Sequence, residues 1–326
     1  MRRGIRAAVA LLVCVPLVVA AGIQANRSGN VHGARSGLTL LVPAAPGGGW
    51  DTVARELQAA MREHGIVTNP RVVNAGGAAG TIGLGQLMEM HGQDDVLMVT
   101  GTVMIGGIEV NDSAYRLEET TPVAHLADDY VALVVPADSP FETVDDFVAA
   151  FEENPGQVSI GGGSVGGTDH LTAGLLAQEV GVDPADVNYI PFAGGGEAVN
   201  ALLSHSVAAG MSGYNEFADQ IEAGSLRILA LSAPEPVPGI GAPTFMEAGY
   251  DLYLPNFRGV VAPPGISPED AAELEAIIEE TVATPEWANA VDRNKWVPNL
   301  QTGQEFGGFL DGEIGRITDV VKELGL

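Results

Sequence analysis

Residues 38–51 read Leu-Thr-Leu-Leu-Val-Pro-Ala-Ala-Pro-Gly-Gly-Gly-Trp-Asp, an apolar stretch that leads into a glycine-rich corner. The pattern predicts a buried strand at 38–42 and a helix at 51–64, with Asp51 as its cap or in its first turn. Glycines let the backbone approach a ligand closely. The first N–H groups of a helix are unpaired and carry a partial positive charge. The stretch therefore predicts an anion site that needs no basic side chain.

The same arrangement occurs twice more along the chain. Residues 161–168 read Gly-Gly-Gly-Ser-Val-Gly-Gly-Thr, and residues 192–197 read Phe-Ala-Gly-Gly-Gly-Glu. Each follows a predicted strand, at 158–160 and 187–190, and precedes a predicted helix, at 168–180 and 198–204. We expect the three helix ends to converge on one small anionic ligand.

The remaining chain alternates between predicted strands and helices, which is typical of α/β proteins with parallel sheets. A strand at 131–135 begins a second series of units, and helices at 269–282 and 304–324 return to the first. This order predicts two lobes with a cleft between them, where strand ends and helix N-termini meet. Lobe 1 would comprise residues 37–128 and 257–326, and lobe 2 would comprise residues 129–256. Further strands are expected at 71–74, 96–100, 207–211, 226–231 and 257–262, and further helices at 82–90 and 144–151.

The N-terminus has the form of an export signal. Arg2, Arg3 and Arg6 precede an apolar run at 7–23, and small residues near Ala25 would permit cleavage. We predict a signal peptide at 1–25 and a flexible leader at 26–36, with an N-terminal membrane anchor as the alternative. Cys14, the one cysteine, lies inside the apolar run, so the mature protein would have no thiol chemistry.

Composition and charge argue against several classes of function. The chain has 42 acidic and 15 basic residues and a formal net charge of -27, which repels nucleic acids and anionic membrane surfaces. None of the histidines stands at a metal-ligand spacing from another His or from Cys, so we expect neither a metal nor another cofactor. We also expect a monomer and no catalytic residues.

The glycines at 161–168 fit three motifs of enzymes and nucleotide-binding proteins. A dinucleotide site needs an acid after the next strand, where Phe192 stands instead. A phosphate loop needs a lysine where Gly167 stands. Ser164 matches a nucleophile elbow, although the last histidine after it is His205, early for that fold. A serine hydrolase that uses Ser164 is the alternative to a binding protein.

For each of two side chains near these glycine corners, the sequence leaves two roles open. Trp50 would either pack under the first glycine loop as a core residue or form an apolar wall of the site. Arg258 lies on an otherwise apolar strand at 257–262 and therefore requires either an acidic partner or a ligand.

Four motifs, in order along the chain, resemble those of the TctC/Bug family of extracytoplasmic solute receptors. They lie at 42–55, with Gly-Gly-Gly-Trp-Asp, at 74–83, with Asn-Ala-Gly-Gly-Ala-Ala-Gly-Thr-Ile-Gly, at 191–198, and at 256–265, with Asn-Phe-Arg-Gly. The first and the last resemble the TctC branch. The resemblance extends from about residue 38 to the C-terminus.

The resemblance implies a two-lobed periplasmic-binding-protein fold, type II-like, that closes on a small carboxylate. It also implies that the chain is periplasmic and that its partner is the membrane permease of a tripartite tricarboxylate transporter. In the family the first and second-lobe glycine loops hold a carboxylate through N–H groups and hydroxyls. The candidate ligand-binding residues are Ala45, Gly47, Gly48, Trp50, Asp51, Gly77, Thr100, Ser164, Gly166, Thr168, Asp169, Phe192, Gly194 and Arg258.

These observations predict a solute-binding protein without enzymatic activity that captures a small organic di- or tricarboxylate. A receptor that presents its ligand to a sensor, and not to a permease, would have the same sequence features.

Overall fold

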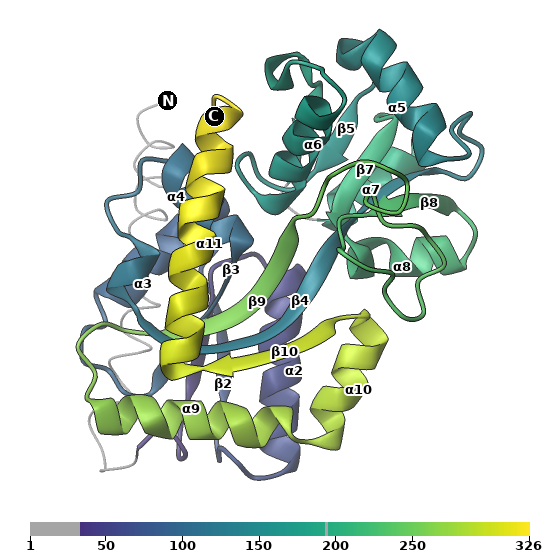
Figure 1. Ribbon diagram of the computed structural model, residues 1–326. Coiled ribbons are helices and arrows are strands. Elements are labelled where there is room, and N and C mark those ends of the chain that lie inside the picture. Colours follow the sequence, from purple (N-terminus) through teal and green to yellow (C-terminus); the bar gives the residue numbers. More distant parts are fainter. Residues whose placement is uncertain (1–32, 193–194) are drawn as a thin grey trace, which may run out of the picture. The chain divides into compact units, whose positions relative to one another are not determined.

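A computed structural model describes residues 33–192 and 195–326 (Figure 1). The predicted export segment at 1–25, most of the leader at 26–36, and Gly194 lie outside the described residues. Residues 34–326 form one unit, to which the following description applies. No helix in the described part of the chain is long and apolar enough to cross a lipid bilayer.

In this unit ten strands join into one hydrogen-bonded network. The strands are β1 (Thr39–Val42), β2 (Arg71–Asn74), β3 (Val96–Gly101), β4 (Thr121–Pro136), β5 (Ile160–Gly162), β6 (Tyr189–Pro191), β7 (Ala209–Gly213), β8 (Leu226–Leu231), β9 (Pro255–Ala262) and β10 (Val297–Thr302).

Helices cover the strands and connect them. The α-helices are α2 (Gly49–Glu63), α3 (Thr81–Met88), α4 (Thr102–Val110), α5 (Val144–Glu153), α6 (Thr168–Glu179), α7 (Gly195–Leu203), α8 (Tyr214–Glu222), α9 (Pro268–Val282), α10 (Pro285–Asn294) and α11 (Gly303–Glu323). Short 3-10 helices are η2 (Ala78–Gly80), η3 (Leu117–Glu119), η4 (Pro155–Gln157) and η5 (Pro184–Asp186).

Strand β4 belongs to both parts of the network. Its first ten residues pair with β9, and β10 also pairs with this part, so that β2-β1-β3-β9-β4-β10 form a first sheet. Residues 131–136 of β4 pair with β7 and β8, and β5 and β6 complete a second sheet. Register shifts after Pro122 and His125 mark bulges, which bend a strand. Figure 1 shows β4 and β9 curving from the first sheet toward β7 and β8.

The predicted parallel pairing is correct for only part of each sheet. β1 is parallel to β2 and β3, and β5 is parallel to β6 and β7. The pairs that involve β9, β4, β8 and β10 are antiparallel, which corrects the expectation of wholly parallel sheets. The reason is that β9 returns to the first sheet after the second sheet is complete and inserts between β3 and β4. The alternation of strands and helices along the sequence does not determine whether such a returning strand runs parallel or antiparallel to its neighbours.

The structure also contains elements that the sequence analysis did not predict: α4, α8, α10 and β10. The strand predicted at 131–135 is the last part of β4, which begins at Thr121. The apolar residues of 121–136 are interrupted by polar residues that are also buried. Because of these polar residues, the apolar pattern in the sequence does not indicate the full length of the strand.

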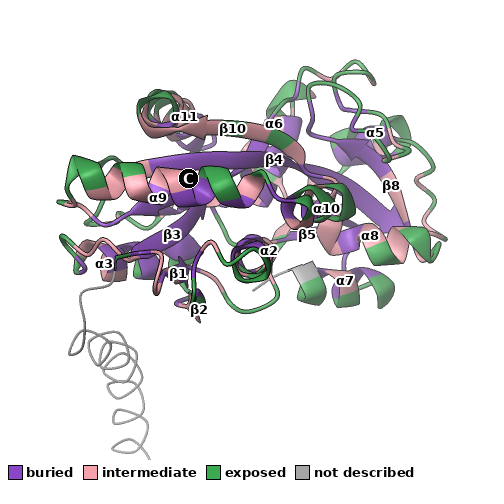
Figure 2. Cartoon of the chain, turned by 90° about the horizontal axis from the view of Figure 1, so that it is seen from below, coloured by how far each residue is buried: buried purple, intermediate pink, exposed green. Residues whose placement is uncertain are grey.

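The apolar core lies against both sheets (Figure 2). Phe147, Phe151 and Phe245 are fully buried in one cluster of the second sheet, and Phe217 is buried in another. The helices after β9 return to the first sheet, as predicted: α9 packs on β4 and α2, and α11 packs on β4 and α4. Figure 2 shows β4 buried and the outer sides of α9 and α10 exposed. The division into lobes, with boundaries at residues 128 and 256, stays a prediction.

Candidate functional site

A cavity of about 600 Å³ lies where elements of the two sheets meet. Its lining includes the N-caps of four α-helices: Gly48 of α2, Gly80 of α3, Gly167 of α6 and Gly213 of α8. None of the four caps forms a side-chain hydrogen bond. By contrast, α5, α9 and α10 begin with side-chain caps from Thr143, Ser267 and Thr284. The cavity therefore gathers helix ends whose first N–H groups no cap side chain covers.

The first corner contains an acidic residue that orders the loop. Asp51, in the first turn of α2, accepts hydrogen bonds from Gly47 N–H (2.8 Å), Arg55 Nε (2.7 Å) and Asn74 Nδ2 (2.9 Å). Burial raises the pKa of Asp51, but the hydrogen bonds outweigh burial and hold the pKa below its ordinary value. The prediction that Asp51 lies in the first turn is confirmed, and its carboxylate faces its own loop.

The second glycine loop packs against the first. A Cβ at Gly76 would lie 2.9 Å from the backbone of Ala44 and Ala45. Gly80 has φ +95°, and a Cβ there would lie 2.8 Å from the Trp50 ring. Glycine is thus required at both positions. Trp50 is 5% exposed and lines the cavity, so both of its predicted roles apply: it is buried under the loop and forms an apolar wall.

The second-sheet corner repeats the design of the first. Gly163 N–H donates to Asp169 Oδ2 (2.8 Å), and Asp169 lies in the first turn of α6. Burial raises the pKa of Asp169 to about 6, against hydrogen bonds from Gly163 and Ser212. Ser164 and Thr168 also line the cavity. The corner therefore offers hydroxyl groups and a helix end beside a carboxyl group that is buried.

Among the described residues that line this cavity, Arg258 is the one with a positively charged side chain. It has an acidic partner. Its Nη2 donates to Asp129 Oδ2 at 2.5 Å, and both side chains are almost fully buried. Of the two alternatives predicted for Arg258, an acidic partner or a ligand, the acidic partner is present. Burial raises the pKa of Asp129, an effect that the guanidinium opposes. The guanidinium also lies against Gly49, where a Cβ would be 2.8 Å from Nη2.

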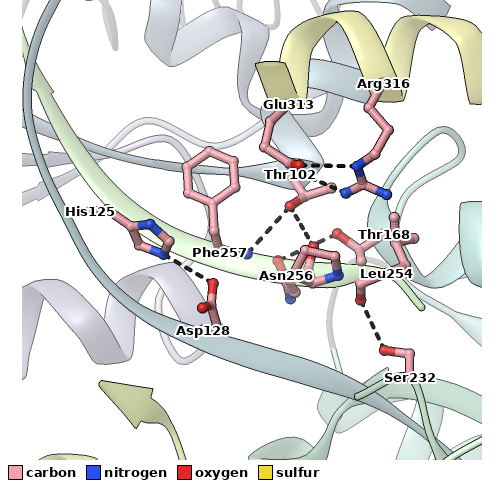
Figure 3. Close-up of polar contacts among 11 residues, drawn as sticks. Thr102, His125, Asp128, Thr168, Ser232, Leu254, Asn256, Phe257, Glu313 and Arg316 are labelled. Atoms are coloured by element: carbon pink, nitrogen blue, oxygen red, sulfur yellow. Dashed lines mark hydrogen bonds and ion pairs between the residues drawn. The ribbon is translucent and has the colours of Figure 1, made fainter. Parts of the chain in front are cut away.

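The start of β9 is fixed by side chains from two other elements, α4 and α6 (Figure 3). Thr102 Oγ1 donates to Pro255 O (2.8 Å), and Phe257 N–H donates to Thr102 Oγ1 (3.3 Å). Thr168 Oγ1 donates to Asn256 Oδ1 (3.4 Å), which connects α6 with β9 (Figure 3). These contacts hold Asn256 and Arg258 at the cavity, because both residues belong to the same short strand.

Glu216 is a cavity residue that sequence reasoning missed, together with Ser212 and Asn256. It lies in the first turn of α8 and lines the cavity together with Gly49, the first residue of α2. Burial raises the pKa of Glu216 to about 7, with a further contribution from Asp169. A sequence signal existed, since Glu216 follows β7 by three residues. It was overlooked because α8 was not predicted.

The structure brings eight of the predicted site residues to the cavity and places five elsewhere. Those in the lining are Ala45, Gly48, Trp50, Gly77, Ser164, Thr168, Asp169 and Arg258. Gly47, Asp51, Thr100, Gly166 and Phe192 are not in the lining. A helix end that the sequence analysis did not predict, that of α8, also lines the cavity. Phe192 packs against the core cluster of α7 and α8.

The histidine nearest to Ser164 along the chain, His170, is engaged elsewhere. Its Nδ1 accepts a hydrogen bond from Gly166 N–H (3.1 Å), and its ring packs on Tyr189 with centroids 4.4 Å apart. This geometry gives Ser164 no support as a nucleophile, which needs a base within hydrogen-bond distance. In the described residues no cluster of three or more His, Cys, Asp or Glu side chains could hold a metal ion.

Comparisons with known proteins agree with this geometry. The chain is 29% identical to protein BugT of Bordetella pertussis, over 97% of each chain. Its fold is similar to the structure of the periplasmic binding protein BugD, with a TM-score of 0.80 and 22% identity over 89% of this chain and 98% of that one. It is also similar to MatC of Rhodopseudomonas palustris with bound malate, with a TM-score of 0.78 and 24% identity over 88% and 99% of the two chains.

The predicted fold class is therefore confirmed as that of periplasmic binding proteins. The family described as the tripartite tricarboxylate transporter family receptor, TctC, matches residues 53–326. Members of this family bind solutes and are not enzymes, which removes the serine hydrolase alternative. The chain belongs to the TctC family of solute-binding receptors.

Proposed function

We propose that the protein is an exported receptor that captures a small organic di- or tricarboxylate and delivers it to the permease of a tripartite tricarboxylate transporter. The observation that carries this proposal is the set of four helix ends without side-chain caps around one cavity. Helix N-termini are suited to carboxylates, since their N–H groups and dipoles favour negative charge.

The shape and composition of the cavity support a small polar ligand. Its volume of about 600 Å³ is within the range of small-molecule sites. Trp50 and Val103 offer apolar surface for a short carbon chain, while Ser164 offers a hydroxyl donor. MatC, which shares the fold, binds malate, so malate is a suitable first probe for this chain.

The same proposal covers location and assembly. Export would follow from the signal at 1–25, and the protein would act as a monomer outside the cytoplasmic membrane. Closure would bring lobe 1 (37–128 and 257–326) and lobe 2 (129–256) together around the ligand, with β4 and β9 as the connecting strands. Hinge closure around a ligand is a common motion of such proteins.

A thermal-shift screen of the purified protein tests this function. The panel contains malate, succinate, citrate, tricarballylate and, as a non-carboxylate anion, phosphate. A ligand at about one hundred times its Kd adds about 2.7 kcal/mol to the free energy of unfolding. We expect a clear rise in Tm with at least one carboxylate and none with phosphate.

A pair of serine variants provides the control. Ser164→Ala removes a hydroxyl from the cavity lining and should weaken carboxylate affinity several-fold. Ser204→Ala, at an exposed position after α7, should leave the affinity unchanged. A protein that is stabilised by phosphate or nucleotides but by no carboxylate would contradict the proposal.

A further inference from the structure

The charges around the cavity do not match those expected for a carboxylate site. The charged residues in its described lining are Asp169, Glu216 and Arg258. Arg258 is already paired with Asp129 at 2.5 Å, and both groups are buried. Two carboxyl groups therefore remain without a cation of their own in a cavity that is proposed to accept an anion. Like charges in such a site strongly disfavour binding.

Glu216 lies beside a helix end that the ligand would use. It belongs to the first turn of α8, and it lines the cavity together with Gly49, the first residue of α2. Asp169 of α6 and Arg258 of β9 line the same cavity, and Arg258 is paired with Asp129 of β4. An ionised ligand that enters here meets an ionised Glu216 among the N–H groups on which the site depends.

A proton on Glu216 would remove this conflict. A protonated carboxyl group has one O–H donor in addition to its acceptor oxygens. An O–H that donates to a carboxylate forms a short, strong hydrogen bond. Glu216 would then be a donor at the same place where its ionised form is a competitor.

We propose that Glu216 is a ligand-binding residue that acts in its protonated form, so that capture of a carboxylate takes up one proton from solution. This inference rests on the proposed function, because it requires that the cavity binds a carboxylate. It adds Glu216 to the ligand-binding residues and one proton to the binding reaction.

The pKa values of the carboxyl groups in the unliganded site support the inference. Burial raises the pKa of Glu216 to about 7 and that of Asp169 to about 6. The carboxylate of a bound ligand would raise the pKa of a neighbouring carboxyl group further. Near neutral pH, Glu216 is thus close to the midpoint of its titration before the ligand arrives, and ligand binding shifts it to the protonated form.

Isothermal titration calorimetry of the full-length protein measures the proton directly. Citrate, malate and succinate are each titrated at pH 6.5, 7.5 and 8.5, in pairs of buffers with different ionisation enthalpies. We expect uptake of close to one proton per ligand at pH 8.5 and less at pH 6.5. Above pH 7, Kd should rise by about tenfold per pH unit, as linkage to a single proton requires.

Two glutamine variants on the same helix separate Glu216 from general effects. Glu216→Gln places an amide N–H₂ donor where the protonated acid would be, so it should bind at pH 8.5 at least as tightly as the unmodified protein. Its proton uptake and most of its pH dependence should be lost. Glu222→Gln, at an exposed position of α8, should behave like the unmodified protein.

The possible failures are distinguishable. Carboxylate binding without proton uptake would overturn this inference and leave the proposed function intact. Weaker binding by Glu216→Gln, with a preference for ligands that carry an ammonium group, would also overturn it, because Glu216 would then act as a counter-charge. Absence of binding by every carboxylate at all three pH values would overturn both. The buffer comparison on the unmodified protein needs no variant to fold.

Discussion

Arg258 shows how one residue can serve both stability and the site. It is 5% exposed on β9, and its guanidinium contacts both Asp129 and the backbone at Gly49. A buried ion pair offsets the desolvation of its members only while both partners are present. The residue that gives the cavity its positive charge is therefore also one that the fold cannot lose easily.

Replacing Arg258 alone should be strongly destabilising. Arg258→Gln leaves Asp129 buried without a cation, and the expected loss is about 3–5 kcal/mol in the free energy of unfolding. Urea denaturation followed by circular dichroism measures it. The double variant Asp129→Asn/Arg258→Gln should recover much of the loss, since no unpaired charge remains.

An exposed ion pair provides the comparison for this prediction. Arg293, which is paired with Glu56 at 2.6 Å and is 59% exposed, should lose less than about 1 kcal/mol on change to glutamine. If Arg258→Gln were no more damaging than Arg293→Gln, the ion pair with Asp129 would not be important for the fold.

At the scale of elements, α3 contains two glycines with opposite surroundings. A Cβ at Gly83 would lie 2.6 Å from Pro43 Cβ and 3.0 Å from Pro43 Cα, so the helix packs directly on the first loop. A Cβ at Gly85 would lie 3.5 Å from the Tyr115 ring, an ordinary contact. Helix propensity favours alanine at both positions, and packing opposes it only at the first.

Alanine substitutions in α3 should therefore have opposite effects on stability. Gly83→Ala should destabilise the protein by about 1–3 kcal/mol, because the rigid Pro43 backbone has to move. Gly85→Ala should stabilise it by up to about 1 kcal/mol, through reduced entropy of the unfolded chain. Chemical denaturation of the two variants checks both signs, and equal effects would show that α3 does not rest on Pro43.

Helix caps differ between the cavity and parts of the surface. α5, α9 and α10 begin with Thr or Ser side-chain caps, whereas α2, α3, α6 and α8, whose N-caps line the cavity, begin with glycine. A side-chain cap satisfies N–H groups that a ligand would otherwise reach. The glycine caps thus give up some helix stability where the chain is proposed to bind.

The stability of the whole molecule should depend on pH in a defined direction. The folded-state pKa values of Glu216 and Asp169, about 7 and about 6, lie above their ordinary values of 4.5 and 3.8. The folded state therefore binds more protons than the unfolded state across this interval, and stability falls as pH rises from about 4 to about 7. The contribution of Asp51 has the opposite sign and is lost only at lower pH.

Thermal unfolding of the unliganded protein from pH 4.5 to 8 measures this effect. One pKa unit corresponds to about 1.4 kcal/mol, and partial exposure of Glu216 reduces its share, so we expect a loss of about 1–3 kcal/mol. Glu216→Gln should flatten the profile between pH 5 and 7. A variant profile parallel to that of the unmodified protein would contradict the assignment of this slope to Glu216.

The net charge of -27 also acts on the molecule as a whole. Self-repulsion of like charges destabilises a compact state, and salt screens it within about 10 Å at 0.1 M. The Tm should therefore rise by a few degrees between 0.05 M and 0.5 M NaCl, and equally with KCl. A Tm that is unchanged or lower at 0.5 M salt would show that repulsion between like charges does not contribute significantly to the stability of the protein.

The sequence by itself determined those features that depend on neighbouring residues. The strands at 71–74 and 226–231, the glycine corners before α2 and α6, and the acid in the first turn of each helix follow from local propensity. The family follows from four motifs in order. For Arg258 the sequence predicted either an acidic partner or a ligand, since an arginine on a buried strand needs one of the two.

Only the tertiary structure decided which residues share the cavity. Asp129 and Arg258 are 129 positions apart, and β9 brings them together by inserting antiparallel between β3 and β4. Glu216 lies on α8, yet it lines the same cavity as Gly49 of α2 and Asp169 of α6. The raised pKa values of Asp169 and Glu216 arise from burial. Burial is a property of the packed chain, because desolvation depends on atoms that are distant in sequence.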